Sequence, residues 1–164
     1  MNVFSVDNLQ VCYGNNVVLN NISFDIGEGE FVAVIGHNGC GKSTLLKSLL
    51  GMKKHSCGRV LFYGKDINSF RAKEFAKHYS WVGQGFDEKI PLTVFDFVFL
   101  GRFPHNTSCF DIFRKDDDFK KVHDVLDVCG IVHLSSKKIT EISGGELRLA
   151  QIAASLVQND RLLI

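Results

Sequence analysis

The stretch "GHNGCGKST", Gly36–Thr44, decides the fold. It fits the spacing G-x-x-x-x-G-K-[ST], in which glycines let the backbone amides surround an anion without a Cβ in the way. The stretch lies between the apolar run "FVAVI", Phe31–Ile35, and the leucine-rich segment "KSTLLKSLLGM", Lys42–Met52. A helix that begins at such a loop points its positive end at the same anion. The sequence therefore predicts a phosphate-binding loop between a buried strand and a helix.

Each position of this loop has an expected role. Lys42 is expected to reach the β- and γ-phosphates of a nucleotide, and the Ser43 hydroxyl to bind Mg²⁺. Cys40 either is a reactive thiol, because it lies at a helix N-terminus beside a lysine, or only supplies its backbone N–H. The expected nucleotide-binding residues are Gly36, His37, Asn38, Gly39, Cys40, Gly41, Lys42, Ser43 and Thr44.

The segments around the loop predict an α/β fold that begins with strands. "VFSVDNLQVCY" and "VVLNNISFDI" show short alternating apolar runs, typical of an antiparallel part of a sheet. The continuous apolar run 31–35 favours a strand buried on both faces, as in a parallel core sheet. "GRVLFYGKDI" is expected to be a strand that runs into a Gly64–Asp66 turn, "RAKEFAKH" a helix, and "YSWVG" a short buried strand.

From Pro91 to Lys138 the apolar period becomes helical. Thr93 is expected to cap a helix that ends near Gly101, with Pro104 preventing its continuation. A second helix follows, with three aspartates in its first turn, where they complement the helix dipole. We interpret 91–138 as a helical insert within one domain, not as a separately folding domain.

The composition excludes several classes of protein. The chain has 164 residues, a net charge of +1 and no apolar run that approaches a membrane span, so neither a nucleic-acid partner nor a transmembrane segment is expected. Its five cysteines are odd in number and widely spaced, which favours reduced thiols. The six histidines show no spacing typical of a metal cluster.

A second motif narrows the choice among phosphate-loop proteins. "ISGGELRLAQIAASL", Ile142–Leu156, is a Ser-Gly-Gly turn that opens an amphipathic helix, and such a turn is a further place for an anion. Together the two motifs resemble the ATP-binding cassette (ABC) family, whose signature is usually Leu-Ser-Gly-Gly-Gln. Ile142 and Glu146 depart from that signature. The negative charge of Glu146 near a phosphate is expected to weaken nucleotide binding at the signature.

The resemblance implies roles for further residues. Tyr13 lies where the family has the aromatic ring that stacks on adenine, and Gln84 where it has the glutamine that reaches Mg²⁺ and the attacking water. Ser143, Gly144 and Gly145 match the signature. The resemblance thus implies Lys42 and Gln84 as catalytic residues, Ser43 and Gln84 as Mg²⁺ ligands, and ATP with Mg²⁺ as cofactors.

The family's architecture implies a P-loop cassette over residues 1–164, with an antiparallel N-terminal part, a parallel core sheet and the helical insert. Two such cassettes pack head to tail, so that each signature caps the nucleotide held by the other subunit. "LTVFDFVFLGRFPH", Leu92–His105, resembles the insert of importers for iron-siderophore, haem and cobalamin chelates. Membrane permease subunits, and indirectly a substrate-binding protein, are the implied partners, at the cytoplasmic face of a membrane. His105 is either a feature of that subfamily or a surface loop residue.

The last residues, "RLLI", resemble the opening of the strand that in the family leads to the Walker B aspartate and glutamate. We therefore expect a cassette whose core is incomplete at the C-terminal side and which is deficient in hydrolysis alone, without that pair and the switch histidine. Two alternatives stay open: a soluble ABC ATPase that works in DNA repair or on ribosomes, and a nucleotide binder without turnover.

Overall fold

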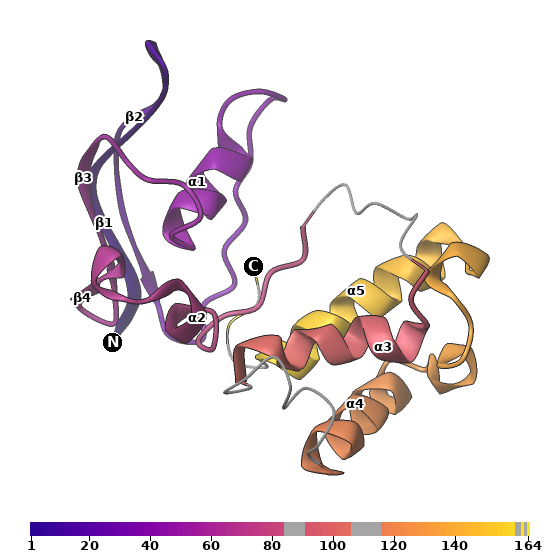
Figure 1. Ribbon diagram of the computed structural model, residues 1–164. Helices are drawn as coiled ribbons and strands as arrows, with labels where there is room; N and C mark the ends of the chain where they lie inside the picture. The colour runs from indigo at the N-terminus through magenta and orange to yellow at the C-terminus, as the bar shows by residue number, and fades with distance from the viewer. Residues whose placement is uncertain (84–90, 106–115, 160–161, 163) are drawn as a thin grey trace. The chain divides into compact units, whose positions relative to one another are not determined.

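The computed structural model describes residues 1–83, 91–105, 116–159, 162 and 164. The chain forms two compact units, Met1–Ala72 and Lys73–Ile164, which are described here one at a time. The first unit holds a β-sheet with one helix beside it, and the second is almost entirely helical (Figure 1). This is the mixed α/β composition that the sequence predicts, with the strands at the N-terminal side.

The sheet of the first unit is antiparallel, in the strand order β2-β1-β3-β4. The antiparallel N-terminal part is therefore confirmed. A tight turn joins the last two strands, with Tyr63 at φ 47° and Gly64 at φ 77°. The residues Lys65 and Asp66, expected as part of that turn, instead pair with β3 as a two-residue strand. The strands are β1 (Asn2–Tyr13), β2 (Asn16–Gly27), β3 (Cys57–Phe62) and β4 (Lys65–Asp66).

One irregularity in β1 keeps its apolar side chains on a single face of the sheet. Val6 and Leu9 are both buried although three positions separate them, which a regular strand with its period of two does not allow. Asn8 lies between them at φ 49°, and the register against β2 shifts at the same place. The extra residue of this bulge restores the alternation, so Leu9 and Val11 again face the core.

The prediction of a buried strand at Phe31–Ile35 is wrong for the described chain. Phe31 is 97% exposed and Ile35 is 92% exposed, and the segment belongs to none of the strands. A strand exists only through pairing, and among the described residues of the first unit the paired strands are β1 with β2, β1 with β3, and β3 with β4. The segment 31–35 thus has the apolar composition of a core strand but pairs with no strand of the described residues.

The second unit buries one apolar core between three helices, α3 (Val94–Phe99), α4 (Asp116–Val128) and α5 (Gly144–Gln158). Helix α5 lies alongside α3, and both contact α4 (Figure 1). The core includes Val98, Val122 and Leu126, which meet the small residues Ala150 and Ala153 of α5. Short 3₁₀ segments complete the two units: η1 (Ile67–Ser69), η2 (Leu100–His105), η4 (Val132–Leu134) and η5 (Ile139–Glu141).

Three helix predictions in this unit are confirmed and one needs correction. Thr93 caps α3, its Oγ1 accepting from the Asp96 amide at 3.0 Å, and the three aspartates begin α4. The α-helix also ends near Gly101, at Phe99, and the chain continues through Pro104 as the 3₁₀ segment η2. The helix expected over 71–78 is limited to α2 (Ala72–Phe75). The insert bounds 91–138 stay a prediction, and the described part of that range packs with α5 in one unit.

A trace of the predicted parallel pairing is present in the second unit. The Ser80 amide donates to Leu162 at 2.8 Å, and the Ile164 amide donates back to Ser80 at 3.0 Å. The Val82 amide then donates to Ile164 at 2.9 Å. This staggered exchange is the hydrogen-bond pattern of parallel strands. The expected buried strand at 79–83 is supported at its first two residues, Tyr79 and Ser80, which are both buried.

Candidate functional site

The loop Gly36–Thr44 is folded as an open backbone nest that ends in helix α1 (Lys42–Leu49). Gly39 and Gly41 adopt φ 85° and φ 100°, a region that residues with a Cβ rarely enter. Lys42 turns back over the loop, and its Nζ donates to the carbonyls of Gly36 at 2.7 Å and His37 at 2.8 Å. An ammonium held by two loop carbonyls beside a helix N-terminus suits a polyphosphate, because the ligand can replace the carbonyls as its partner.

The sheet supports this loop from one side. A Cβ on Gly41 would lie 2.8 Å from Leu19 Cδ2 and 3.2 Å from Val18 Cγ1, both on β2. No side chain caps α1, and no acid stands in its first turn. The positive end of α1 is thus fixed against the sheet and carries no anionic group of its own, as an anion site requires.

Tyr13 ends β1 at the hairpin that leads into β2, in the same unit as the phosphate loop. Its ring is 49% exposed, and the Lys53 ammonium lies over it, 3.9 Å from the ring centroid. The ring is accessible to a base, in keeping with the expected stacking role, which nothing in the structure tests. The cation over the ring is a feature that sequence reasoning missed.

The Ser-Gly-Gly motif begins helix α5, as predicted. Ser143 is the N-cap, and its Oγ accepts from the Glu146 amide at 3.3 Å. The Glu146 carboxylate in turn accepts from the Ser143 amide and from the Ser143 hydroxyl, both at 2.7 Å. These hydrogen bonds from Ser143 hold the pKa of Glu146 below its usual value, so the carboxylate is ionised at neutral pH. An anion already stands at this helix end, and it belongs to the chain.

The two glycines of the motif are not required by the fold. An added Cβ on Gly144 or Gly145 would meet nothing within 4 Å, and neither residue has a positive φ. Glycine costs a helix up to about 1 kcal/mol relative to alanine. The space above the first turn of α5 is therefore open, and it fits the close approach of a ligand.

Gln84, the expected Mg²⁺ and water ligand, lies outside the described residues. The structure does bring its neighbour Gly83 to helix α5, where Arg148 Nη1 donates to the Gly83 carbonyl at 3.2 Å. Sequence reasoning missed Arg148, although its place one turn after the Ser-Gly-Gly motif was visible. The phosphate loop and the motif belong to different units and are described separately.

A cavity of about 360 Å³ lies in the second unit beside Trp81 and Gly83. Residues of α3, η2 and α5 line its other walls, among them Leu100, Gly101 and Gln158. Leu100 is 50% exposed and Phe103 is 45% exposed on η2. Apolar side chains around an open hollow are typical of a surface that another protein covers.

Four of the five cysteines lie among the described residues. Cys12, Cys40, Cys57 and Cys129 are free thiols there. Among the described residues, no cluster of His, Cys, Asp or Glu has the arrangement of a metal site. Over those same residues, no helix combines the length and the hydropathy needed to cross a bilayer.

Known proteins similar to this chain agree with its two motifs. The family model described as ABC transporter matches residues 19–164. An uncharacterised ABC transporter ATP-binding protein of Methanocaldococcus jannaschii, MJ0089, is 36% identical over 99% of the chain and 62% of that protein. The ferric enterobactin transport ATP-binding protein FepC of Escherichia coli is 34% identical over 96% of the chain and 58% of that protein. The chain thus spans about three fifths of these relatives.

A solved structure gives the same result for the fold. The crystal structure of a nucleotide-free ATP-binding cassette from an ABC transporter superimposes with a TM-score of 0.83 at 26% identity, over 97% of this chain and 66% of that chain. Since the family model covers nearly the whole chain and the fold is that of its cassettes, the resemblance drawn from the two motifs is confirmed. The chain belongs to the ABC transporter family and has the fold of its ATP-binding cassettes.

Proposed function

We propose that this protein is the ATP-binding subunit of an importer for a metal chelate of the siderophore, haem or cobalamin type. The observation that carries the proposal is the phosphate loop, with Gly39 and Gly41 at positive φ and the Lys42 ammonium bound to the Gly36 and His37 carbonyls. Mg²⁺ and ATP fit this site, because the loop offers backbone amides and the Lys42 ammonium for the phosphates and the Ser43 hydroxyl for the metal.

In this proposal Lys42 binds the β- and γ-phosphates, Ser43 binds Mg²⁺, and Tyr13 stacks on the adenine base. Gln84 binds Mg²⁺ and orients the attacking water. Ser143, Gly144 and Gly145 act on the nucleotide of a second subunit, packed head to tail. The room beside both glycines of α5 supports that role, since no atom of the described residues lies within 4 Å of a Cβ added at either one.

The chelate cargo is supported by the relatives and by the insert. Besides FepC, they include the iron(3+)-hydroxamate import protein FhuC of Bacillus subtilis, 32% identical, and the petrobactin import protein FpuD of Bacillus anthracis, 31% identical. A candidate metal-chelate type ABC transporter in an inward-facing conformation superimposes with a TM-score of 0.78 at 31% identity, over 96% of this chain and 56% of that chain. A phosphonate import protein of Oceanobacillus iheyensis, PhnC 2, is 33% identical and supplies the rival cargo.

Permease subunits at the cytoplasmic face of a membrane are the proposed partners. The hollow beside Gly83, which the half-exposed Leu100 lines, supports docking of a permease on this surface of the second unit. A substrate-binding protein would act through the permease. Co-purification of the subunit with membrane helices supports this arrangement, whereas recovery with ribosomes or with repair complexes would favour the soluble ABC class.

The test of cargo is uptake in cells that lack the gene. We expect the deletion to abolish uptake of radiolabelled iron or cobalamin chelates, and the wild-type gene, but not a Lys42→Ala version, to restore it. Normal chelate uptake with loss of phosphonate uptake would transfer the proposal to the rival cargo.

We further propose that a polypeptide of residues 1–164 binds ATP without measurable turnover, because the family's general base follows the strand that opens at "RLLI". Filter binding with labelled ATP, beside a phosphate-release assay, tests this. Phosphate release clearly above that of a Lys42→Ala version of the same polypeptide would contradict it.

A further inference from the structure

The stretch "GRFPH", Gly101–His105, follows α3 and lies against the C-terminal end of α5. Gly101 has no room for a side chain, because a Cβ would overlap the Ala154 carbonyl oxygen of α5. The backbone of η2 therefore packs directly on the backbone of α5. No other residue type fits there without displacing one of the two segments.

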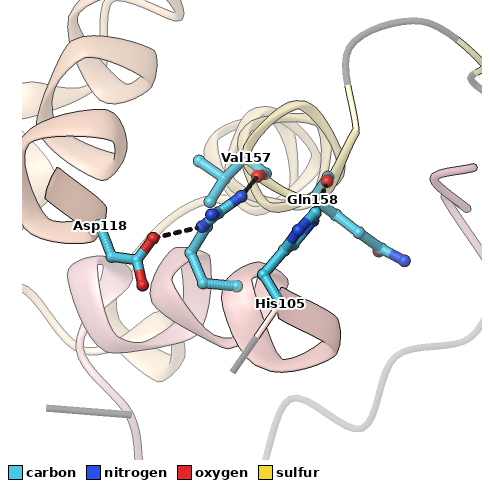
Figure 2. Close-up of polar contacts among 5 residues, drawn as sticks. His105, Asp118, Val157 and Gln158 are labelled. Carbon is cyan, nitrogen blue, oxygen red and sulfur yellow. Dashed lines mark hydrogen bonds and ion pairs between the residues drawn. The ribbon is translucent and has the colours of Figure 1, made fainter. Parts of the chain in front are cut away.

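Two side chains of the same stretch complete the end of α5 (Figure 2). Arg102 Nη1 donates to the Val157 carbonyl at 3.0 Å, and His105 Nε2 donates to the Gln158 carbonyl at 2.7 Å. The last carbonyls of a helix have no partner within the helix, and cations are favoured beside them. Arg102 and His105 thus act as the C-terminal cap of α5, although they are more than fifty residues away along the chain.

Helix α4 joins this contact through Asp118. Arg102 Nε donates to Asp118 Oδ1 at 2.7 Å, with 14% and 7% of the two side chains exposed. One guanidinium therefore connects α4 to α5, a task that its planar fork of donors allows and a lysine cannot perform. We name Gly101, Arg102, His105 and Asp118 together the α5 clamp.

We propose that Arg102 and His105 are positioning residues for the Ser-Gly-Gly motif, residues 143–145, at the opposite end of α5. This proposal rests on the function proposed above. The core side chains of α5 hold the helix against α3 and α4. Because apolar burial is not directional, it fixes the tilt and the axial position of the helix less firmly than hydrogen bonds do. The clamp supplies directional contacts at one end. Because α5 has 15 residues, its ends are about 22 Å apart, and a tilt of about 5° at the clamp moves Ser143 by about 2 Å. Catalysis that depends on the signature is sensitive to displacements of about 1 Å.

The clamped end is also joined to the segment that leads toward Gln84. Gln158 Nε2 donates to the Ala76 carbonyl at 2.9 Å, and Asn159 Nδ2 donates to the Lys77 carbonyl at 2.7 Å. Near the other end, Arg148 contacts Gly83. Polar contacts therefore hold α5 near both of its ends, and at the C-terminal end the clamp acts on the same turn as Gln158 and Asn159.

His105 is suited to act as a neutral donor. Burial lowers its pKa, the hydrogen bond to Gln158 raises it in part, and the nearby cations Arg102, Lys121 and Lys77 lower it further. The neutral ring carries one N–H, and its placement on Nε2 provides the bond to Gln158.

The test uses the full-length protein with three single substitutions. His105→Leu removes the donor, His105→Gln keeps an amide donor, and His123→Leu on the exposed face of α4 is the matched control. For Arg102, the pair Arg102→Met with Asp118→Leu removes both charges together, so that no buried carboxylate is left unpaired.

The first readout is amide hydrogen exchange without nucleotide. We expect His105→Leu to speed exchange at the N-terminal turn of α5, at the Glu146 and Leu147 amides, and His105→Gln to restore protection. Faster exchange confined to Val157–Asn159, or equal to that of His123→Leu, would show a local cap and overturn the proposal.

The second readout separates kcat from KM for ATP. We expect His105→Leu and the Arg102/Asp118 pair to lower kcat by about tenfold with KM changed less than about twofold, because the phosphate loop is untouched. An unchanged kcat would overturn the proposal. A wild-type protein without ATP turnover would instead contradict the proposed function, and the exchange measurement would still decide on the clamp.

Discussion

The two glycine-rich helix ends of this protein are built in opposite ways. Helix α1 follows Gly41 without a side-chain cap or an acid in its first turn, and the Lys42 ammonium donates to two loop carbonyls. Helix α5 begins at Ser143 with a complete capping box, in which Glu146 already occupies the anion position. The first end is arranged to receive an anion and the second is satisfied by the chain itself. A ligand at the second end has to replace Glu146 or share Ser143 with it.

The largest effect is expected at the first end. Lys42→Ala should weaken binding of a fluorescent Mg-ATP analogue by about 100-fold or more, because the ligand loses its charged partner. Lys47→Ala, in the last turn of the same helix, is the matched control and should bind within about twofold of wild type. Undiminished affinity in Lys42→Ala would remove the basis for the nucleotide site.

Alkylation of Cys40 should act at the same end. Cys40 Sγ lies 3.9 Å from Lys42 Nζ, and a Cβ on Gly36 would lie 2.7 Å from that sulfur, so an added group would fill the loop. We expect complete modification to reduce nucleotide affinity by about tenfold or more, and bound ATP to slow it. Exposed Cys57 should react at the same rate with and without ATP. Full affinity after modification of Cys40, checked by mass spectrometry, would show that only its backbone matters.

Gly41 before α1 and Gly144 in α5 are expected to have different roles, the first in stability and the second in turnover. Gly41→Ala should destabilise the fold by about 1–3 kcal/mol, because φ 100° and the contact with Leu19 exclude a side chain. Gly144→Ala should leave thermal stability within about 1 kcal/mol of wild type, yet lower ATP turnover of the full-length protein by about tenfold. A variant Gly144→Ala with full turnover would show that the space above α5 is not used.

A smaller, favourable effect is expected for Glu146→Gln. The substitution removes a negative charge from the site where a phosphate would approach, so the nucleotide-dependent association of two subunits should tighten by about threefold. Sedimentation with a slowly hydrolysed ATP analogue measures this, and Glu141→Gln on η5 serves as the control. Weaker association would mean that the carboxylate positions Ser143 rather than competing with phosphate.

The smallest effect is on stability in acid. Because the pKa of Glu146 is lowered by folding from its usual 4.5, the capping box contributes stability above that pH and loses it as the pH falls through the folded value. The wild-type advantage over Glu146→Gln should therefore be present at pH 7 and decline as the pH falls below 4.5 toward the lowered folded-state value. Helix α1 has no acid in its first turn and contributes no such dependence. Parallel urea titrations at several pH values measure the difference.

The features predicted correctly from the sequence are those whose causes are local. Thr93 caps its helix through a residue three positions away, and the Ser-Gly-Gly turn opens α5 at the expected residues. The wrong prediction at Phe31–Ile35 concerned a strand, which depends on pairing with segments distant in the sequence. Arg102 was missed for a similar reason, since its partners Asp118 and Val157 come together only in the folded unit.

The cavity beside α5 has a practical consequence. The chain contains a single tryptophan, Trp81, and it lines this cavity together with residues of α3 and α5. Indole emission shifts in colour and intensity with the polarity around the ring, so the protein carries one built-in optical reporter in its helical unit. A change in fluorescence when nucleotide is added to the other unit would reveal communication between the two without any label.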